Sequence, residues 1–142
     1  MSNFEKNLEQ ALINAKRLTD KILIDGKLIS AQTNNKIPVL NPSTGDNIGS
    51  APQCNKDDVN IAVESAHKAF QKWKKIPARE RGKMVAAGAK RLEERKSEIE
   101  TLLSLDTGNA LRTQAIPETG ASIELTNMFA GLSGELKGEN YP

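Results

Sequence analysis

The sequence contains few of the residues from which catalytic and metal centres are usually built. Its 142 residues include one cysteine, Cys54, and one histidine, His67. A single cysteine excludes an internal disulfide, and one cysteine with one histidine cannot form a common zinc site. So little cysteine fits a reducing, cytosolic setting.

Aromatic residues, net charge and long apolar runs are also scarce. Aromatic side chains make up 4% of the chain, so its core must depend on aliphatic and alanine packing. The 20 basic and 18 acidic side chains leave a net charge of +2, which argues against a surface that attracts nucleic acid. No run reaches the ~20 apolar residues of a membrane span, and Glu5 and Glu9 argue against a mitochondrial leader. We therefore expect a cytoplasmic protein with no membrane segment.

Residues 2–19 are expected to form an N-terminal helix. Ser2 and Glu5 have the spacing of a capping box, in which each side chain pairs with the other residue's backbone N–H. A narrow apolar stripe follows at helical spacing, which predicts a peripheral helix docked on a larger body. The stripe comprises Phe4, Leu8, Ala11, Leu12 and Ala15.

Two β-hairpins are predicted between residues 20 and 52. Asp25-Gly26 separates two short apolar runs and favours a tight turn, because that turn needs a positive φ that glycine adopts freely. The second hairpin turns at residues 41–45, where proline and glycine are combined. Pro38 and Pro52 indicate edge positions, since proline donates no backbone hydrogen bond.

Three further helices are predicted, over residues 55–75, over 79–106 and from about 117 to 138. Asn55 is a favourable N-cap for the first, and Gly108 is placed to end the second. The chain is therefore expected to be mostly α-helical with two short edge β-hairpins. The buried stripes predicted for the three helices are Val59, Ala62, Val63, Ala66, Ala69, Phe70 and Trp73; Val85, Gly88, Ala89, Leu92, Ile99, Leu102 and Leu103; and Ala121, Leu125, Met128, Phe129, Leu132 and Leu136.

No complete chemical site emerges from these residues. Cys54 precedes a helix N-terminus, a position that activates some thiols, but no base is fixed beside it. His67 lies next to an apolar stripe and is interpreted as a surface histidine. Asp106 and Glu118 have no fixed separation for acid–base work. The G-x-G-x-x-G motif of dinucleotide folds and the Walker loop are both absent.

Basic residues between positions 79 and 95 alternate with glutamates. This mixture predicts a solvated helix face rather than a nucleic-acid surface. The basic residues are Arg79, Arg81, Lys83, Lys90, Arg91 and Arg95, and the interleaved acids are Glu80, Glu93 and Glu94.

Several short motifs occur in an order that is characteristic of one enzyme family. Residues 24–27 match an I-x-G-x-W/L hairpin, 41–48 match N-P-x-T-G-x-x-I, and 105–108 match L-D/E-x-G. Residues 58–73 match D-V-x-x-A-V-x-x-A-x-x-A-F-x-x-W. Together they resemble the start of the NAD(P)-dependent aldehyde dehydrogenase family. Further matches are Arg81 after Pro77, Ala130-Gly131-Leu132 and Lys137-Gly138-Glu139, and the departure is Asn109-Ala110, where the family usually has Lys-Pro.

The resemblance implies an α/β fold for the complete enzyme and an incomplete domain here. Residues 1–19 would be the N-terminal helix, and residues 20–142 the amino-terminal part of the cofactor-binding domain. Family members are several-fold longer, and this part supplies outer helices and edge hairpins that pack on a parallel sheet encoded elsewhere. We expect an excised piece, a truncated reading frame or one half of a split enzyme.

The resemblance places the chemistry outside this chain. The complete enzyme would oxidise an aldehyde to a carboxylate with NAD or NADP through a cysteine thioester. The family's nucleophilic cysteine, glutamate base, asparagine oxyanion donor and nucleotide loops all come later, and Cys54 does not match the nucleophile's position. No residue here is assigned a catalytic or cofactor-binding role, and the chain alone is predicted to be inactive.

A cation site and the binding partners follow from the same resemblance. Many family members hold a monovalent cation near the residue before N-P and near the acid of L-D-x-G, which are Leu40 and Asp106 here. Carbonyl and carboxylate oxygens suit a hard cation, although both residues could simply shape turns. The expected partners are an aldehyde for the complete enzyme, and a second copy or a complementary C-terminal chain. The alternative function is a non-catalytic helical module that docks on a partner chain, and a helical nucleic-acid binder is disfavoured by the near-neutral charge.

Overall fold

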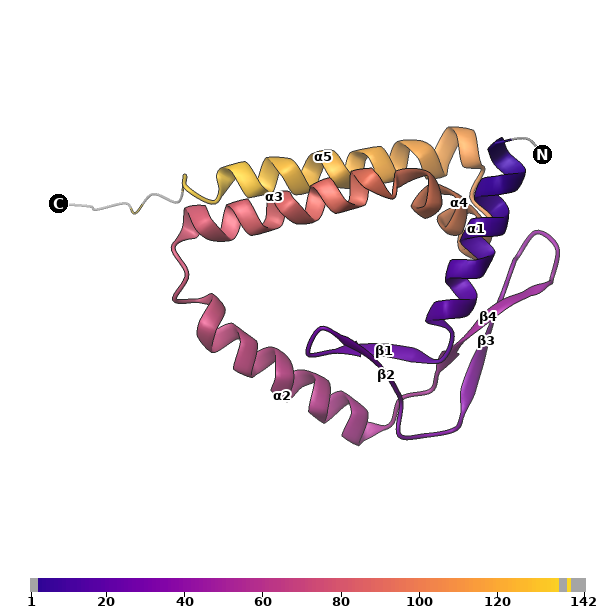
Figure 1. Cartoon of the computed structure of the whole chain (residues 1–142), viewed down its shortest axis with the longest axis horizontal. Coiled ribbons are helices and arrows are strands. Elements are labelled where there is room, and N and C mark those ends of the chain that lie inside the picture. Colours follow the sequence, from indigo (N-terminus) through magenta and orange to yellow (C-terminus); the bar gives the residue numbers. More distant parts are fainter. Residues whose placement is uncertain (1–2, 136–137, 139–142) are drawn as a thin grey trace.

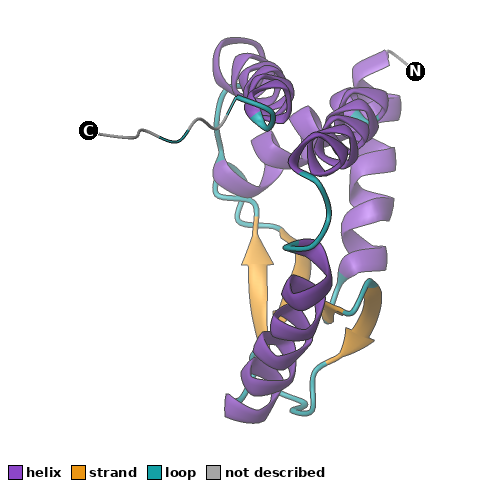
Figure 2. Cartoon of the chain, turned by 90° about the vertical axis from the view of Figure 1, so that its left-hand side faces the viewer, coloured by secondary structure: helices purple, strands orange, loops and turns teal. Residues whose placement is uncertain are grey.

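The computed structural model describes residues 3–135 and residue 138, which form mainly helices together with two β-hairpins (Figure 1). Helices α3, α4 and α5 lie at one end of the molecule, while α2 and the hairpins lie toward the other (Figure 2). In chain order the elements are α1 (Asn3–Leu18), β1 (Lys21–Ile24), β2 (Lys27–Ser30), β3 (Lys36–Leu40), β4 (Asn47–Pro52), α2 (Lys56–Trp73), α3 (Ala78–Glu94), α4 (Lys96–Thr107), the π-helical turn η1 (Leu111–Ala115) and α5 (Ile116–Leu132).

Helix α1 confirms the predicted N-terminal helix and packs against α4 and β4. Ala11 is fully buried, and Leu8, Leu12 and Ala15 are half-buried on the same side, so the narrow stripe is the packed face. The proposed capping residue Ser2 lies outside the described residues, as does the side chain of Phe4. Among the described residues, no helix is long and apolar enough to cross a lipid bilayer.

Both predicted hairpins are present, and each is a separate antiparallel pair. Asp25 and Gly26 both have positive φ, at 52° and 72°, as the tight turn between β1 and β2 requires. The second pair joins β3 to β4 with an irregular register between Val39 and Leu40. The glycine and proline residues in the turns therefore predicted the positions of both hairpins, and the structure confirms them.

Helix α2 begins with a full capping box. The Asn55 side chain accepts a 2.9 Å hydrogen bond from the Asp58 backbone N–H, and the Asp58 carboxylate accepts a 3.0 Å bond from that of Asn55. Beyond this anchor the helix stands away from α3 and α5 (Figure 1). Its apolar stripe forms at the predicted spacing, but Val63 and Phe70 are 62% and 54% exposed, so the stripe is not buried here.

The single helix predicted over residues 79–106 is wrong, because the chain breaks at Arg95 into α3 and α4. Arg95 has φ −112° and ψ 15°, and its guanidinium forms two hydrogen bonds with the Glu98 carboxylate. The break has a tertiary cause: α3 packs along α5, whereas α4 turns away to pack against α1. Gly108 ends α4 with φ 75°, as predicted.

Helix α5 differs from its prediction in both its end and its buried side. It stops at Leu132 rather than near Gly138, and Leu136 lies outside the described residues. The buried side chains facing the bundle are Thr119, Ile123 and Ala130. The predicted buried residues are instead exposed in this chain, with Leu125 at 50%, Met128 at 49%, Phe129 at 63% and Leu132 at 49%.

Candidate functional site

The two residues proposed for a cation lie on segments that the fold brings together. Leu40 ends strand β3, and Asp106 lies in the last turn of α4. A Cβ atom placed on Gly108 would lie 2.8 Å from Cγ of Pro42, so the end of α4 packs directly on the turn that follows Leu40. Val39 and Asp106 line the same cavity of about 390 Å³. The segments that carry Leu40 and Asp106 therefore lie close together, although Leu40 itself does not line this cavity.

That cavity is mainly aliphatic. Its walls come from α1, β3, β4 and α4, and its oxygen-bearing side chains are Thr19, Ser50 and Asp106. Thr19 already donates to the Ala15 carbonyl at 3.1 Å, and Ser50 donates to Asp20 at 2.7 Å. Among the described residues, no group of three or more His, Cys, Asp or Glu side chains could hold a metal ion. The described side chains at this cavity do not form a set of cation ligands. A cation bound at Leu40 and Asp106 therefore stays a prediction.

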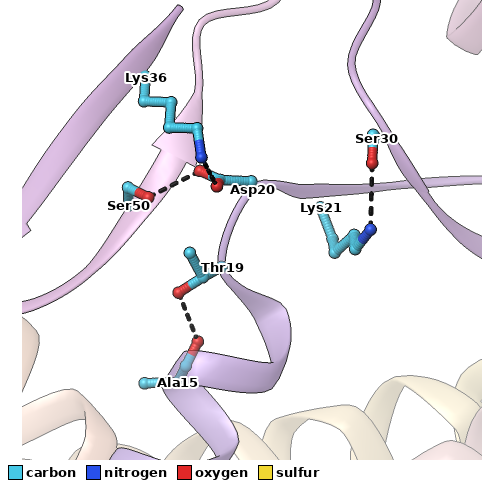
Figure 3. Close-up of polar contacts among 7 residues, drawn as sticks. All are labelled: Ala15, Thr19, Asp20, Lys21, Ser30, Lys36 and Ser50. Carbon is cyan, nitrogen blue, oxygen red and sulfur yellow. Dashed lines mark hydrogen bonds and ion pairs between the residues drawn. The ribbon is translucent and has the colours of Figure 1, made fainter. Parts of the chain in front are cut away.

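A polar junction next to this cavity holds β3 and β4 against the end of α1 (Figure 3). Asp20 has a positive φ of 59°, and its backbone N–H donates to the Ser50 carbonyl at 3.0 Å. Its carboxylate accepts one hydrogen bond from the Ser50 hydroxyl and pairs with the Lys36 ammonium. The hydrogen bonds from Lys36 and Ser50 lower the pKa of Asp20 below its usual 3.8. One carboxylate therefore ties α1 to both strands of the second hairpin.

Sequence reasoning missed this junction, because its three residues are separated along the chain and belong to no motif. Thr19 and Lys21 flank it with their own contacts: Lys21 Nζ donates to Ser30 Oγ at 3.0 Å (Figure 3). Sequence reasoning also missed that Asp58, besides capping α2, accepts a 3.0 Å hydrogen bond from the Gln32 backbone N–H. The three-residue spacing of Asn55 and Asp58 could have indicated the capping role of Asp58, but not its contact with Gln32.

The other residues singled out from the sequence do not assemble into a centre. Cys54 is exposed in the loop before α2, and His67 is exposed on α2 with its Nε2 3.2 Å from the Gln71 amide. The surface interpretation of His67 is confirmed. Asp106 and Glu118 line different cavities, and Glu118 accepts a 3.4 Å hydrogen bond from Asn109. This arrangement supports neither acid–base work nor nucleophilic catalysis.

Four of the six basic residues singled out between positions 79 and 95 form local contacts, Arg81, Lys83, Arg91 and Arg95. Lys83 pairs with Glu80 at 2.7 Å on an exposed helix face, as the mixed pattern predicted. Arg91 pairs with Glu94 at 2.9 Å in the same way. Arg81 instead donates to the Ile76 carbonyl at 2.7 Å, so it closes the connection between α2 and α3. These contacts are structural.

Comparison with known proteins decides the family. The sequence profile described as the aldehyde dehydrogenase family matches residues 28–142. This chain belongs to the aldehyde dehydrogenase family. It is 38% identical over 121 residues to the aldehyde dehydrogenase tropH of Talaromyces stipitatus, a match that covers 85% of this chain and 23% of that protein. It is 34% identical over 128 residues to phenylacetaldehyde dehydrogenase of Pseudomonas fluorescens, covering 89% of this chain and 26% of that enzyme.

The tertiary structure agrees with that family. Betaine aldehyde dehydrogenase of Staphylococcus aureus, solved with NAD+, superposes with a TM-score of 0.85 and 27% identity. The match covers 94% of this chain and 27% of that one. The helices and hairpins described above therefore have the aldehyde dehydrogenase fold, and the chain spans about a quarter of the length of these relatives. The membership that the order of motifs predicted is confirmed.

Proposed function

We propose that this chain supplies the amino-terminal part of the cofactor-binding domain of an NAD(P)-dependent aldehyde dehydrogenase. The observation that carries the proposal is the combination of a family match over residues 28–142 and close superposition on an enzyme solved with NAD+. A second similar structure, PnpE, was solved with nicotinamide adenine dinucleotide. In the complete enzyme, the bound cofactor would accept hydride as an aldehyde is oxidised to a carboxylate.

The contribution of this chain is to cover and brace that domain. In this proposal residues 1–19 would supply its peripheral helix and residues 20–142 its outer helices and hairpins. The Asp20 junction and the capping box of α2 fix these elements, while apolar side chains of α2 and α5 stay exposed. The residues described in this chain do not form a nucleotide-binding loop, so no cofactor contact is assigned to it. A monovalent cation at Leu40 and Asp106, and a cytoplasmic location, stay predictions.

A direct assay tests the inactivity of the chain. The purified chain is mixed with phenylacetaldehyde and either NAD+ or NADP+, and formation of NADH or NADPH is followed. We expect no turnover above a blank without protein. Turnover by the chain alone would overturn the proposal, because it would require a nucleophile and a cofactor site among these residues.

A chimera tests the role in the complete enzyme. Residues 28–142 replace the matching segment of phenylacetaldehyde dehydrogenase from Pseudomonas fluorescens. We expect a folded chimera that forms NADH from phenylacetaldehyde. A chimera that folds and remains inactive would favour the alternative of a non-catalytic helical module, which needs the exposed apolar sides but no enzyme.

A further inference from the structure

The chain exposes far more surface than a folded monomer of its size. Its accessible surface is 10492 Å². A folded monomer of 15.5 kDa exposes about 7,200 Å², so this chain has about 3,000 Å² more than expected. A standard protein interface buries only about 800 Å² on each side. The excess is large enough for an extensive interface with a partner.

One part of that surface is the outward side of α5. Leu125, Met128, Phe129 and Leu132 are all about half exposed or more, and their i, i+3, i+4, i+7 spacing places them on one side of the helix. An apolar stripe with this spacing is the side that a helix normally buries. Helix α3 covers only the side of Thr119, Ile123 and Ala130. We call the uncovered residues, Leu125, Met128, Phe129 and Leu132, the α5 face.

A second part is a groove beside α2. It has a volume of about 940 Å³ and lies between α2, the end of β1 and α3. Phe70 and Trp73 are its aromatic lining residues, and Met84 contributes to its lining from α3. We call it the α2 groove, with the large apolar lining residues Ile24, Ile61, Phe70, Trp73, Ile76 and Met84. The charged side chains that also line it are Asp25, Glu64, Lys68 and Lys72. Because α3 also packs along α5, it connects the groove to the α5 face.

We propose that the α5 face and the α2 groove together form a docking surface that binds the rest of the aldehyde dehydrogenase fold when that rest is a separate polypeptide. The inference builds on the proposed function. Its occupant follows from two observations. The chain spans about a quarter of its relatives, and its elements already have the relatives' arrangement, with a TM-score of 0.85.

The experiment mixes the 142-residue chain with the carboxy-terminal part of phenylacetaldehyde dehydrogenase from Pseudomonas fluorescens, starting directly after the matching segment. Size-exclusion chromatography with light scattering measures the mass of any complex. We expect a complex with one copy of each chain. Phe129→Glu and Phe70→Glu should each raise its dissociation constant at least tenfold, because each places a charge in an apolar contact.

Matched controls come from the same helices. Glu124→Gln on α5 and Asn60→Ser on α2 change exposed polar positions and should leave the dissociation constant within twofold of the unsubstituted chain. Circular dichroism of each variant checks that the helices persist. Equal weakening by the controls would overturn the assignment of the surface.

The remaining outcomes also decide the question. The absence of a complex overturns the inference. A dimer of this chain alone that the same phenylalanine variants disrupt also overturns it, because the occupant is then a second copy. A complex that forms no NADH keeps the docking surface and counts against the proposed function, whereas an active chimera without a two-chain complex counts against the docking surface alone.

Discussion

The hydroxyl of Ser50 donates a 2.7 Å hydrogen bond to the carboxylate of Asp20, 30 residues earlier in the chain. The backbone N–H of Asp20 donates in return to the Ser50 carbonyl. This reciprocal pair joins the end of α1 to β4, and Lys36 extends it to β3. Because Leu40 lies at the other end of β3, the junction helps to set where the candidate cation position lies relative to α4.

We predict that Asp20→Asn makes the chain less stable near neutral pH and flattens its loss of stability in acid. Asparagine tolerates the positive φ and can still accept from Ser50, but it loses the charge pair with Lys36. The folded-state pKa of Asp20 lies below the usual 3.8, so its contribution is present above that value and is lost as the pH falls through the range beneath it.

Urea unfolding midpoints between about pH 2 and pH 7 measure this effect. Asp46→Asn, in the exposed turn between β3 and β4, serves as the control and should preserve the acid dependence of the unsubstituted chain. If the unfolding midpoints of Asp20→Asn and of the unsubstituted chain change with pH in parallel, the Asp20 carboxylate does not contribute to the acid dependence of stability.

We predict that Gly82→Ala separates α3 from α5. A Cβ at position 82 would lie 2.6 Å from the carbonyl oxygen of Ala130 and would also collide with the Ser133 hydroxyl. The collision involves backbone, so the helices must shift, at a cost of roughly 1–3 kcal/mol in unfolding free energy. Gly88→Ala on the same helix meets nothing within 4 Å and should stabilise by roughly 0.5–1 kcal/mol. Chemical denaturation of both variants measures the difference, and two changes of the same sign would contradict the packing.

We predict that Gly108→Ala displaces the end of α4 from the turn at Pro42. Gly108 has φ 75°, and an added Cβ would lie 2.8 Å from Pro42 Cγ. Gly45 has φ 79° with open space around it, so Gly45→Ala carries a similar backbone strain, roughly 1–2 kcal/mol, without the collision. Thermal unfolding of the two variants isolates the contact: Gly108→Ala should melt at the lower temperature, and equal melting would mean that the contact is dispensable.

We predict that Asp58→Ala costs more stability than a helix cap alone. The carboxylate accepts from the backbone N–H groups of Asn55 and Gln32, so its removal leaves two donors without this acceptor. Asn55→Ala removes one capping bond and should cost about 1 kcal/mol, whereas Asp58→Ala should cost roughly 2–3 kcal/mol. Asp57→Ala, at an exposed position in the same first turn, should cost no more than roughly 1 kcal/mol. Urea denaturation ranks the unfolding free energies of the three variants. If Asp58→Ala is at least as stable as Asp57→Ala, Asp58 does not bridge Asn55 and Gln32.

Local chemistry in the sequence was enough for the turns, the caps and the family. Asp25-Gly26 requires positive φ, Asn55 is a favourable N-cap, and Gly108 ends a helix, so each depends on residues close together in the chain. The family followed from the order of such local motifs. The candidate site could be predicted only as two positions, Leu40 and Asp106, because no local pattern states that α4 packs on the turn after β3.

Tertiary packing decided the rest. Nothing near Arg95 stops a helix, yet the chain turns there because α3 packs on α5 while α4 packs on α1. Helix α5 has apolar residues on two sides, one with Ile123 and Ala130 and the other with Phe129, so periodicity could not select its buried side. The close approach at Gly82 brings Ala130 inward and leaves Phe129 outside. By itself the sequence determined both hairpin turns and most of the helical segments, since those depend on neighbouring residues, but not the break at Arg95. Which faces are covered depends on surfaces that meet only after folding.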